Sequence, residues 1–206
     1  MSHKLQGLYA ITDEVLTPDT TVITQVQTAL EAGADIVQYR NKSAEDSQIE
    51  IICRQLQNLC SAHNALFIID DRPLLAQKID ADGLHIGKND ASLIEARKIF
   101  TRGLIGVSCY GSIRKAKEAQ EEGADYVAFG SFFPSPTKPK SGVISVSVLQ
   151  KAKEALSIPV CAIGGINRNN IHEIASHKPD MISVVNDIFK GDIKRNIIHL
   201  KQGMNL

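Results

Sequence analysis

Short runs of apolar residues recur along the whole chain and predict eight β-strands. Most of these runs are continuous rather than alternating, which is typical of parallel strands buried on both faces. We expect strands at Gly7–Thr12, Ile36–Arg40, Leu66–Asp70, Gly83–Gly87, Leu104–Cys109, Tyr126–Phe132, Pro159–Ile166 and Met181–Phe189.

Segments between these runs follow the three- and four-residue apolar spacing of amphipathic helices. The clearest helix is Ala44–His63, in which apolar residues recur at this spacing from Ile49 to Cys60. An alternation of strands and helices indicates a parallel sheet. Shorter helices are predicted at Leu93–Phe100, Ile113–Gly123, Val146–Leu156, Asn170–His177 and Ile193–Met204.

A weak internal repeat precedes every second predicted strand. In each copy an aspartate stands directly before the apolar run: Asp35, Asp82, Asp125 and Asp180, spaced by 47, 43 and 55 residues. Each interval corresponds to a pair of βα units. The expected fold is therefore a single (βα)8 TIM-barrel domain over residues 1–206. A doubly wound open sheet is the alternative, but the Gly-x-Gly-x-x-Gly loop that follows its first strand is absent from the sequence.

The chain has 23 basic and 23 acidic residues, so its formal net charge is zero. This balance argues against binding to nucleic acid or to a membrane surface. The composition is typical of a globular protein, and neither a bilayer-spanning run nor the apolar core of a secretion signal is seen. No CxxC or metal-ligand spacing links Cys53, Cys60, Cys109 and Cys161, and three of the four sit inside apolar runs. We therefore expect buried, reduced thiols and a cytoplasmic protein.

Polar residues collect where the predicted strands end, which is the end of a (βα)8 barrel that carries the active site. The second strand runs into Gln38-Tyr39-Arg40-Asn41-Lys42. If extended backbone continues through this segment, Gln38, Arg40 and Lys42 share a face, and the two cations suit a phosphate or diphosphate. After the seventh strand, Gly164-Gly165 allows a second ligand group to approach the backbone closely.

Carboxylates near these cations indicate a divalent metal. Asp71 and Asp90 follow the third and fourth strands, which are neighbours in this topology. Magnesium prefers oxygen ligands and bridges protein carboxylates to substrate phosphates. Asp70 and Asp71 are adjacent and should diverge, so only Asp71 is assigned as a ligand with Asp90. His85 is interpreted as a hydrogen-bonded barrel histidine rather than a base, and Cys109 as a packing residue rather than a nucleophile.

Six segments at these strand ends form a joint pattern over nearly the whole chain, from Leu8 to Phe189. They are Gln38-Tyr39-Arg40-Asn41-Lys42, Ile69-Asp70-Asp71-Arg72, Gly83–Asp90, Gly106-Val107-Ser108, Pro134–Pro139 and Ala162–Ile166. This pattern closely resembles the thiamine phosphate synthase family. The resemblance implies a (βα)8 barrel and a magnesium-dependent transferase. It would join hydroxymethylpyrimidine diphosphate to hydroxyethylthiazole phosphate, giving thiamine phosphate and diphosphate.

The resemblance also implies roles for individual residues. The segment that binds the pyrimidine diphosphate is matched by Gln38, Tyr39, Arg40, Asn41 and Lys42, and the two Mg²⁺ ligands by Asp71 and Asp90. Groups on the diphosphate side are matched by Ser108 and Lys138, and Lys138 joins Arg40 and Lys42 as a catalytic residue. Positions that hold the thiazole phosphate are matched by Ser135, Pro136, Thr137, Gly165, Val185 and Asn186.

Three residues depart from the family's usual pattern: Asp70 replaces a common Asn, Lys88 a usual Gln and Asn186 a usual Ser. Asp70 is kept among the substrate-binding residues. An ionised carboxylate near a diphosphate needs an offsetting partner, for which Arg72, the metal, the pyrimidine's amino group and Lys88 are candidates. Because the changes at Asp70 and Lys88 together conserve net charge, we expect these two residues to compensate one another.

Two alternative functions stay open. A thiazole tautomerase, which is a related isomerase, needs an acid–base histidine and no diphosphate machinery. Asp71, Asp90, Arg40 and Lys138 argue against it. A non-catalytic barrel would bind the phosphorylated ligand without turnover. The sequence also leaves open whether the chain forms a homo-oligomer.

Overall fold

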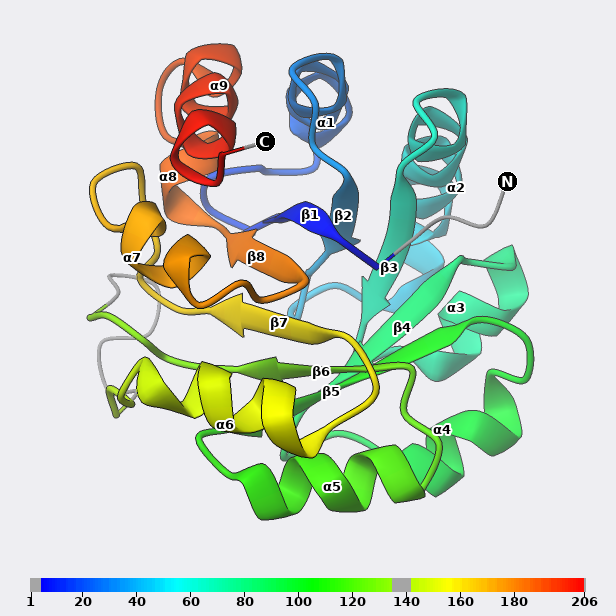
Figure 1. Cartoon of the computed structure of the whole chain (residues 1–206). Helices are drawn as coiled ribbons and strands as arrows, with labels where there is room; N and C mark the ends of the chain where they lie inside the picture. Colours follow the sequence, from blue (N-terminus) through cyan, green and yellow to red (C-terminus); the bar gives the residue numbers. More distant parts are fainter. Residues whose placement is uncertain (1–4, 135–141, 206) are drawn as a thin grey trace.

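A computed structural model describes residues 5–134 and 142–205. Its strands form a closed parallel barrel in which each strand pairs with the next along the chain and β8 pairs with β1 (Figure 1). The predicted (βα)8 barrel is therefore confirmed, and the open sheet is excluded. The strands are β1 (Gly7–Ile11), β2 (Ile36–Tyr39), β3 (Leu66–Asp70), β4 (Gly83–Ile86), β5 (Leu104–Tyr110), β6 (Tyr126–Phe129), β7 (Val160–Ile163) and β8 (Met181–Val184).

Helices lie outside the ring of strands and cover it (Figure 1). Three of them, α1, α3 and α8, are not among the helices predicted from the sequence. The described helices are α1 (Val22–Glu31), α2 (Asp46–Ala62), α3 (Pro73–Ile79), α4 (Leu93–Ile99), α5 (Ile113–Glu121), α6 (Ser147–Ala155), α7 (Ile171–Ser176), α8 (Asn186–Phe189) and α9 (Ile193–Gly203).

Several strands are shorter than the apolar runs that predict them. The run Met181–Phe189 is not one strand, because β8 stops at Val184 and Asn186–Phe189 forms the short helix α8. Strand β7 stops at Ile163, directly before Gly164, whose φ of +106° breaks the extended backbone. Strand β2 stops at Tyr39, so extended backbone does not continue to Lys42.

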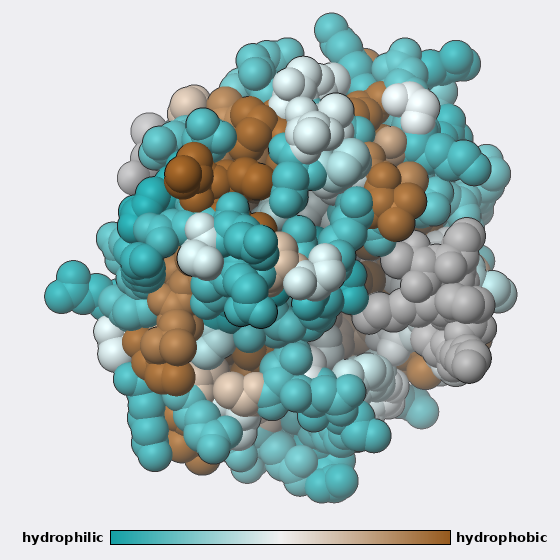
Figure 2. Space-filling view, turned by 180° about the vertical axis from the view of Figure 1, so that it is seen from behind, coloured by the Kyte–Doolittle hydropathy of each residue, from teal (hydrophilic) through white to brown (hydrophobic). Residues whose placement is uncertain are grey.

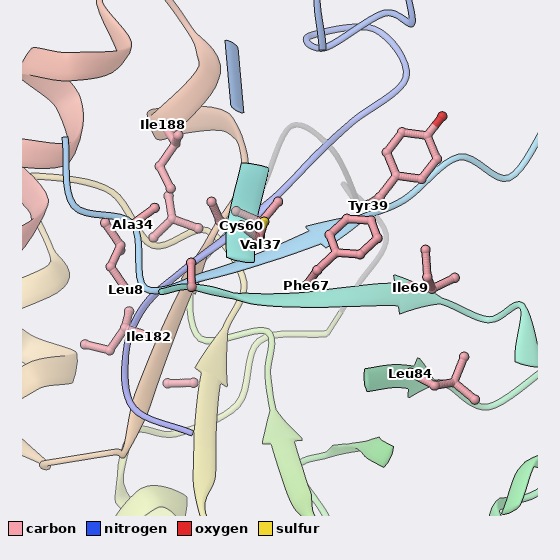
Figure 3. Packing of buried hydrophobic residues seen from close by; sticks show 14 of the residues in the cluster. Leu8, Ala34, Val37, Tyr39, Cys60, Phe67, Ile69, Leu84, Ile182 and Ile188 are labelled. Atoms are coloured by element: carbon pink, nitrogen blue, oxygen red, sulfur yellow. The ribbon is translucent and has the colours of Figure 1, made fainter. Parts of the chain in front are cut away.

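Apolar side chains pack in two layers. In β1, Tyr9 and Ile11 point into the barrel, whereas Leu8 and Ala10 pack between the barrel and the helices. This period of two lets one strand bury both faces. Figure 3 shows the outer layer, in which Phe67 of β3 lies beside residues of the neighbouring elements.

The repeated aspartates have one structural role at the amino ends of the strands. Each stands directly before an even-numbered strand, and its Oδ2 accepts a hydrogen bond from the backbone of the preceding odd-numbered strand. The donors are the N–H groups of Leu8, Phe67, Ile105 and Val160, and the acceptors at 2.7–2.9 Å are Asp35, Asp82, Asp125 and Asp180. The sequence repeat thus marks a contact that links successive strands.

The face shown in Figure 2 is largely hydrophilic, and its apolar residues form separate patches. Within residues 5–134 and 142–205, no helix has the length and apolar character needed to cross a membrane.

Candidate active site

A cavity of about 630 Å³ opens at the carboxyl ends of the strands. All eight strands contribute to its lining, so the barrel itself holds the site in shape. One lining residue from each strand is, in order, Ile11, Gln38, Asp70, His85, Ser108, Ala128, Ile163 and Ser183.

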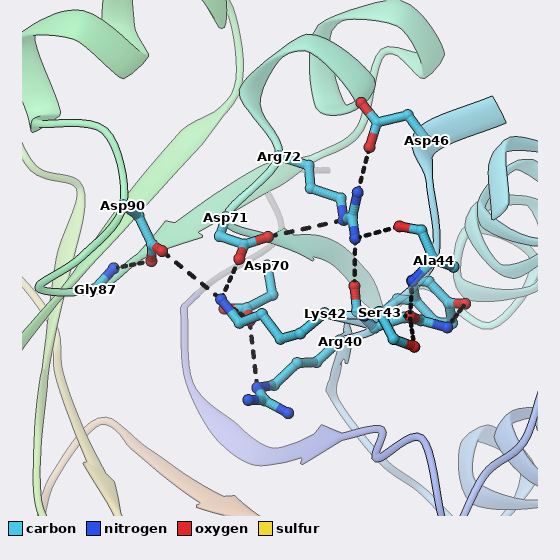
Figure 4. A network of polar contacts seen from close by, with 12 residues as sticks. Arg40, Lys42, Ser43, Ala44, Asp46, Asp70, Asp71, Arg72, Gly87 and Asp90 are labelled. Atoms are coloured by element: carbon cyan, nitrogen blue, oxygen red, sulfur yellow. Dashed lines mark hydrogen bonds and ion pairs between the residues drawn. The ribbon is translucent and has the colours of Figure 1, made fainter. Parts of the chain in front are cut away.

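Two cations reach this cavity from the segment that follows β2. The Arg40 guanidinium Nε lies 3.4 Å from Oδ2 of Asp70, and the Lys42 ammonium lies 3.2 Å from the same oxygen (Figure 4). Although β2 ends before them, both side chains line the cavity together with Gln38. The expected convergence of Gln38, Arg40 and Lys42 is therefore seen, but a turn rather than extended backbone produces it.

The Lys42 ammonium stands among three carboxylates. Besides Asp70, it contacts Asp71 and lies 3.7 Å from Oδ1 of Asp90 (Figure 4). Asp71 has a φ of +55°, in the left-handed region, where the chain turns from β3 into α3. The other oxygen of Asp90 accepts a 2.7 Å hydrogen bond from the backbone N–H of Gly87. The turns after β3 and β4 thus hold two carboxylates toward one point.

Burial and charge act against each other in this cluster. Burial raises the pKa of the Asp70 and Asp71 carboxyls, and the nearby Lys42 ammonium only partly offsets this. Burial lowers the pKa of Lys42, but the Asp71 hydrogen bond and the charges of Asp70, Asp71 and Asp90 outweigh it, so the pKa is raised. Lys42 is consequently held as a cation at neutral pH.

This arrangement fits a magnesium ion. The donors are hard carboxylate oxygens, and a positive group, the Lys42 ammonium, already lies between Asp71 and Asp90. Over the described parts of the chain, no group of three or more His, Cys, Asp or Glu residues has the geometry to hold a metal by itself. Asp71 and Asp90 would therefore share the ion with water and ligand oxygens, as magnesium usually requires.

Arg72 fixes the segment that carries the cations. Its guanidinium pairs with Asp46 at 2.6 Å and donates to the backbone carbonyls of Asn41 and Ala44, each at 2.7 Å. It also lies 3.8 Å from Asp71 (Figure 4). The sequence offered Arg72 as a partner for Asp70, whereas the structure shows it bracing the turn between β2 and α2.

Glu14 braces the same turn from the β1 side, and sequence reasoning missed it. Its carboxylate accepts hydrogen bonds from the backbone N–H of Lys42 at 2.6 Å and from the Ser43 hydroxyl at 2.5 Å. These bonds lower the pKa of Glu14, the Ser43 hydroxyl having the largest effect. No local motif marks Glu14, because its partners lie 28 or more residues away.

Two residues expected to bind substrate do not line the cavity. Tyr39 lies on the outer side of β2, among the residues that pack against the helices, and its hydroxyl donates to Asp19 at 3.0 Å. The Asn41 side chain accepts from the backbone N–H groups of Ser43 and Ala44 and so shapes the turn. The period of two along β2 explains why Tyr39 points away from Gln38.

Other expected residues do line the cavity, on the far side of the barrel from β3. Gly165, Val185 and Asn186 follow β7 and β8 there. Ser108 lines the cavity from β5, which is only two strands away from β3. At Gly165, with a φ of +68°, an added Cβ would lie only 2.4 Å from the carbonyl oxygen of Phe133, so this turn requires glycine. The expected contacts of Ser135, Pro136, Thr137 and Lys138 fall outside the described residues.

Asp70 is paired differently from the expectation. Arg40 and Lys42 are its ion-pair partners, and among the described residues no ion pair joins it to Lys88. Lys88 lines the cavity, and its backbone N–H donates to the Tyr110 hydroxyl at 3.1 Å. Within the described residues, no direct contact between Asp70 and Lys88 therefore supports the expected charge compensation.

Fold and site together define a (βα)8-barrel enzyme whose cavity suits an anionic ligand and a cation. More specifically, the chain belongs to the thiamine monophosphate synthase family, whose model matches residues 8–188. This membership confirms the resemblance, the transferase class and the thiamine-phosphate synthase activity expected from the sequence.

Individual relatives agree with this assignment. Thiamine-phosphate synthase of Wolinella succinogenes is 43% identical over 192 residues, which cover 92% of this chain and 88% of that protein. The enzyme of the same name from Acidithiobacillus ferrooxidans is 42% identical over 194 residues, which cover 92% of this chain and 89% of that protein. Thiamine phosphate pyrophosphorylase from Pyrococcus furiosus superimposes with a TM-score of 0.90 at 35% identity, covering 98% of this chain and 97% of that one.

Proposed function

We propose that this chain transfers a hydroxymethylpyrimidine group from its diphosphate to the ring nitrogen of hydroxyethylthiazole phosphate, giving thiamine phosphate and diphosphate. The observation that carries the proposal is the convergence of Arg40 and Lys42 with the carboxylates of Asp71 and Asp90. Cations and metal-binding carboxylates at one point suit a diphosphate leaving group. Membership of the thiamine monophosphate synthase family supports the same reaction.

The diphosphate belongs near the ends of β2 to β5 in this proposal. Arg40 and Lys42 bind its oxygens, exchanging their contacts with Asp70 for contacts with the ligand. Ser108, on the same side of the cavity, donates a hydrogen bond from its hydroxyl group to the diphosphate. Asp71 and Asp90 would hold Mg²⁺, which supplies charge screening for the departing diphosphate.

The chemistry requires electrostatic stabilisation more than proton transfer. The bond from the pyrimidine's methylene carbon to the diphosphate oxygen breaks, and the bond from the same carbon to the thiazole nitrogen forms. Negative charge grows on the leaving oxygen, where Arg40 and Lys42 stabilise it. The thiazole nitrogen has no proton to lose, so no protein base is required. This agrees with a cavity rich in cations and carboxylates.

The thiazole phosphate belongs across the barrel, near the ends of β7 and β8. Backbone N–H groups around Gly165, Val185 and Asn186 are suited to a phosphate there. The roles of Ser135, Pro136 and Thr137 in holding this phosphate, and of Lys138 beside the diphosphate, stay predictions from the sequence.

A cytoplasmic setting and small-molecule substrates complete the proposal. The four cysteines, all buried free thiols, suit a reducing compartment. The cavity, at about 630 Å³, has the size of a small-molecule site.

The test is incubation of the purified chain with both substrates and Mg²⁺, followed by detection of thiamine phosphate. We expect thiamine phosphate and diphosphate in equal amounts, and neither when one substrate or the metal is omitted. Binding of the pyrimidine diphosphate without product would instead support the non-catalytic barrel. Isomerisation of a thiazole phosphate, without use of the diphosphate, would support the tautomerase.

A further inference from the structure

Five side chains from five strands form one continuous chain of hydrogen bonds across the interior of the barrel. Its donor–acceptor distances are 2.8, 3.0, 3.0 and 2.9 Å. The residues, in order of contact, are Gln38 of β2, Tyr9 of β1, Tyr126 of β6, His85 of β4 and Ser108 of β5. The chain ends at Ser108, which lines the cavity.

The two tyrosines at the centre of this hydrogen-bond chain are buried, and Tyr9 and His85 also line the cavity. Tyr9 is 1% exposed and Tyr126 is fully buried. Burial raises the pKa of both hydroxyls, so each phenol keeps its single proton. The neighbouring strand makes room for the Tyr126 ring at Gly106, where an added Cβ would lie 2.0 Å from the ring. The ring therefore has a fixed place, and its hydroxyl has fixed partners.

The number of protons available sets which group donates in each of these hydrogen bonds. The Gln38 amide nitrogen, which can only donate, faces the Tyr9 hydroxyl, so the Tyr9 oxygen accepts. This leaves the Tyr9 proton for the oxygen of Tyr126, which lies 3.0 Å away. The Tyr126 proton is in turn left for Nδ1 of His85, which lies 3.0 Å away. With Nδ1 as the acceptor in this order, the imidazole carries its proton on Nε2.

That tautomer determines what Ser108 does. The Nε2–H group of His85 donates to the Ser108 oxygen at 2.9 Å, which leaves the serine's own proton for another acceptor. If the hydrogen bonds ran in the opposite direction, the Ser108 hydroxyl would donate to Nε2 of His85. It would then offer only acceptor lone pairs to the cavity. An anionic ligand needs a donor, so only the first direction favours it.

We propose that Gln38, Tyr9, Tyr126 and His85 form a positioning network that presets Ser108 as a hydrogen-bond donor to an anionic ligand. With the proposed function, on which this identification rests, that ligand is the diphosphate. Tyr126 and His85 act through Ser108 and need not touch the ligand themselves. The network also explains why a buried histidine and two buried tyrosines occupy a barrel interior that apolar residues would otherwise fill.

The first test is the tautomer of His85 in the wild-type protein without added ligand. Side-chain proton–nitrogen NMR distinguishes Nε2–H from Nδ1–H, and a His85→Asn variant assigns the signals among the six histidines of the chain. We expect the proton on Nε2 and none on Nδ1. A proton on Nδ1 would reverse the direction and overturn the proposal. This result is independent of which reaction the chain catalyses.

The second test is a double-mutant cycle read by calorimetry with inorganic diphosphate and Mg²⁺. Ser108→Ala should weaken binding about tenfold, the value of a hydrogen bond to a charged group, and Tyr126→Phe about fivefold. Because Tyr126 acts through Ser108, adding Tyr126→Phe to Ser108→Ala should change the affinity less than about twofold.

The outcomes of the cycle separate the two proposals. Full additivity of the two changes would overturn the network. If the wild type does not bind inorganic diphosphate at all, the proposed function fails. The NMR result still decides the direction of the hydrogen bonds from Gln38 to Ser108. Tyr126→Phe keeps the ring that fills the barrel. Should this variant not fold, the wild-type tautomer alone decides the matter.

Discussion

At the scale of the residue, the sequence predicted that Asp70 lies in the site but not which residues pair with it. Its negative charge stands where the ligand is also negative, and the sequence suggested Lys88 as its counterpart. In the structure the partners are Arg40 and Lys42, because β2 and β3 pair side by side and bring the segment after Tyr39 next to the end of β3. Strand pairing, rather than a balance of charge between substitutions, selects the partner.

Replacing Asp70 with Asn should strengthen diphosphate binding. Arg40 and Lys42 then no longer divide their charge between a protein carboxylate and the ligand. We expect about a threefold to tenfold gain in affinity for inorganic diphosphate, measured by calorimetry in the presence of Mg²⁺. Weaker binding would mean that Asp70 is needed to position the two cations.

Lys88→Gln provides the matched control. It removes a cation from the same cavity that makes no ion pair with Asp70 within the described residues. The effects of Asp70→Asn and Lys88→Gln on affinity should add to within about 0.5 kcal/mol. A larger coupling would restore the direct compensation that the sequence suggested.

At the scale of the element, the turn after β2 is the part of the site that the sequence could not describe. The apolar run predicts the strand, and the polar residues behind it predict a ligand site. The geometry of the turn depends on Arg72 and Glu14, which are distant in sequence. Helix α1 was not predicted because its buried residues, among them Val22, Val26 and Leu30, form a narrow stripe between polar residues.

Glu14 should stabilise this turn in a pH-dependent manner. Its pKa is lowered in the fold by the Ser43 hydroxyl and the Lys42 N–H, so it contributes stability above its ordinary pKa of 4.5. That contribution is lost as the pH falls through the lowered pKa. Glu14→Gln should reduce the free energy of unfolding by less than about 1 kcal/mol at neutral pH.

The measurement is the difference in thermal midpoint between wild type and Glu14→Gln over a series of pH values. The difference should be present at neutral pH and disappear in acid. A difference that stays constant as the pH is lowered would show that the ionised carboxylate is not the stabilising form.

At the scale of the whole molecule, the barrel was the most predictable feature. Eight buried runs, alternating helices and the repeated aspartates together indicate a closed ring, because each signal recurs along the entire chain. The structure adds the reason for the repeat, since each aspartate links the starts of two neighbouring strands. These links lie at the amino ends, away from the cavity. The contribution of these aspartates to stability therefore lies at the end of the barrel opposite to the cavity.

Asp82→Ala should accordingly destabilise the fold and spare the chemistry. It removes the acceptor at 2.9 Å from the backbone N–H of Phe67 and leaves that buried donor without this bond. We expect a loss of about 1–3 kcal/mol in chemical denaturation, with kcat unchanged at a temperature where the variant is folded. Asp82→Asn keeps an acceptor oxygen and should lose less. A reduced kcat in the folded variant would contradict this division of roles.

In the proposed function, Asp71 and Asp90 hold a metal ion that meets a diphosphate bound by Arg40 and Lys42. The most direct measurement is a crystal structure of the protein with Mn²⁺ and inorganic diphosphate, with the metal located by its anomalous scattering. We predict a peak between the carboxylates of Asp71 and Asp90, with diphosphate oxygens joining it to Arg40 and Lys42. A metal bound elsewhere in the cavity, or a diphosphate that avoids these two cations, would contradict the account.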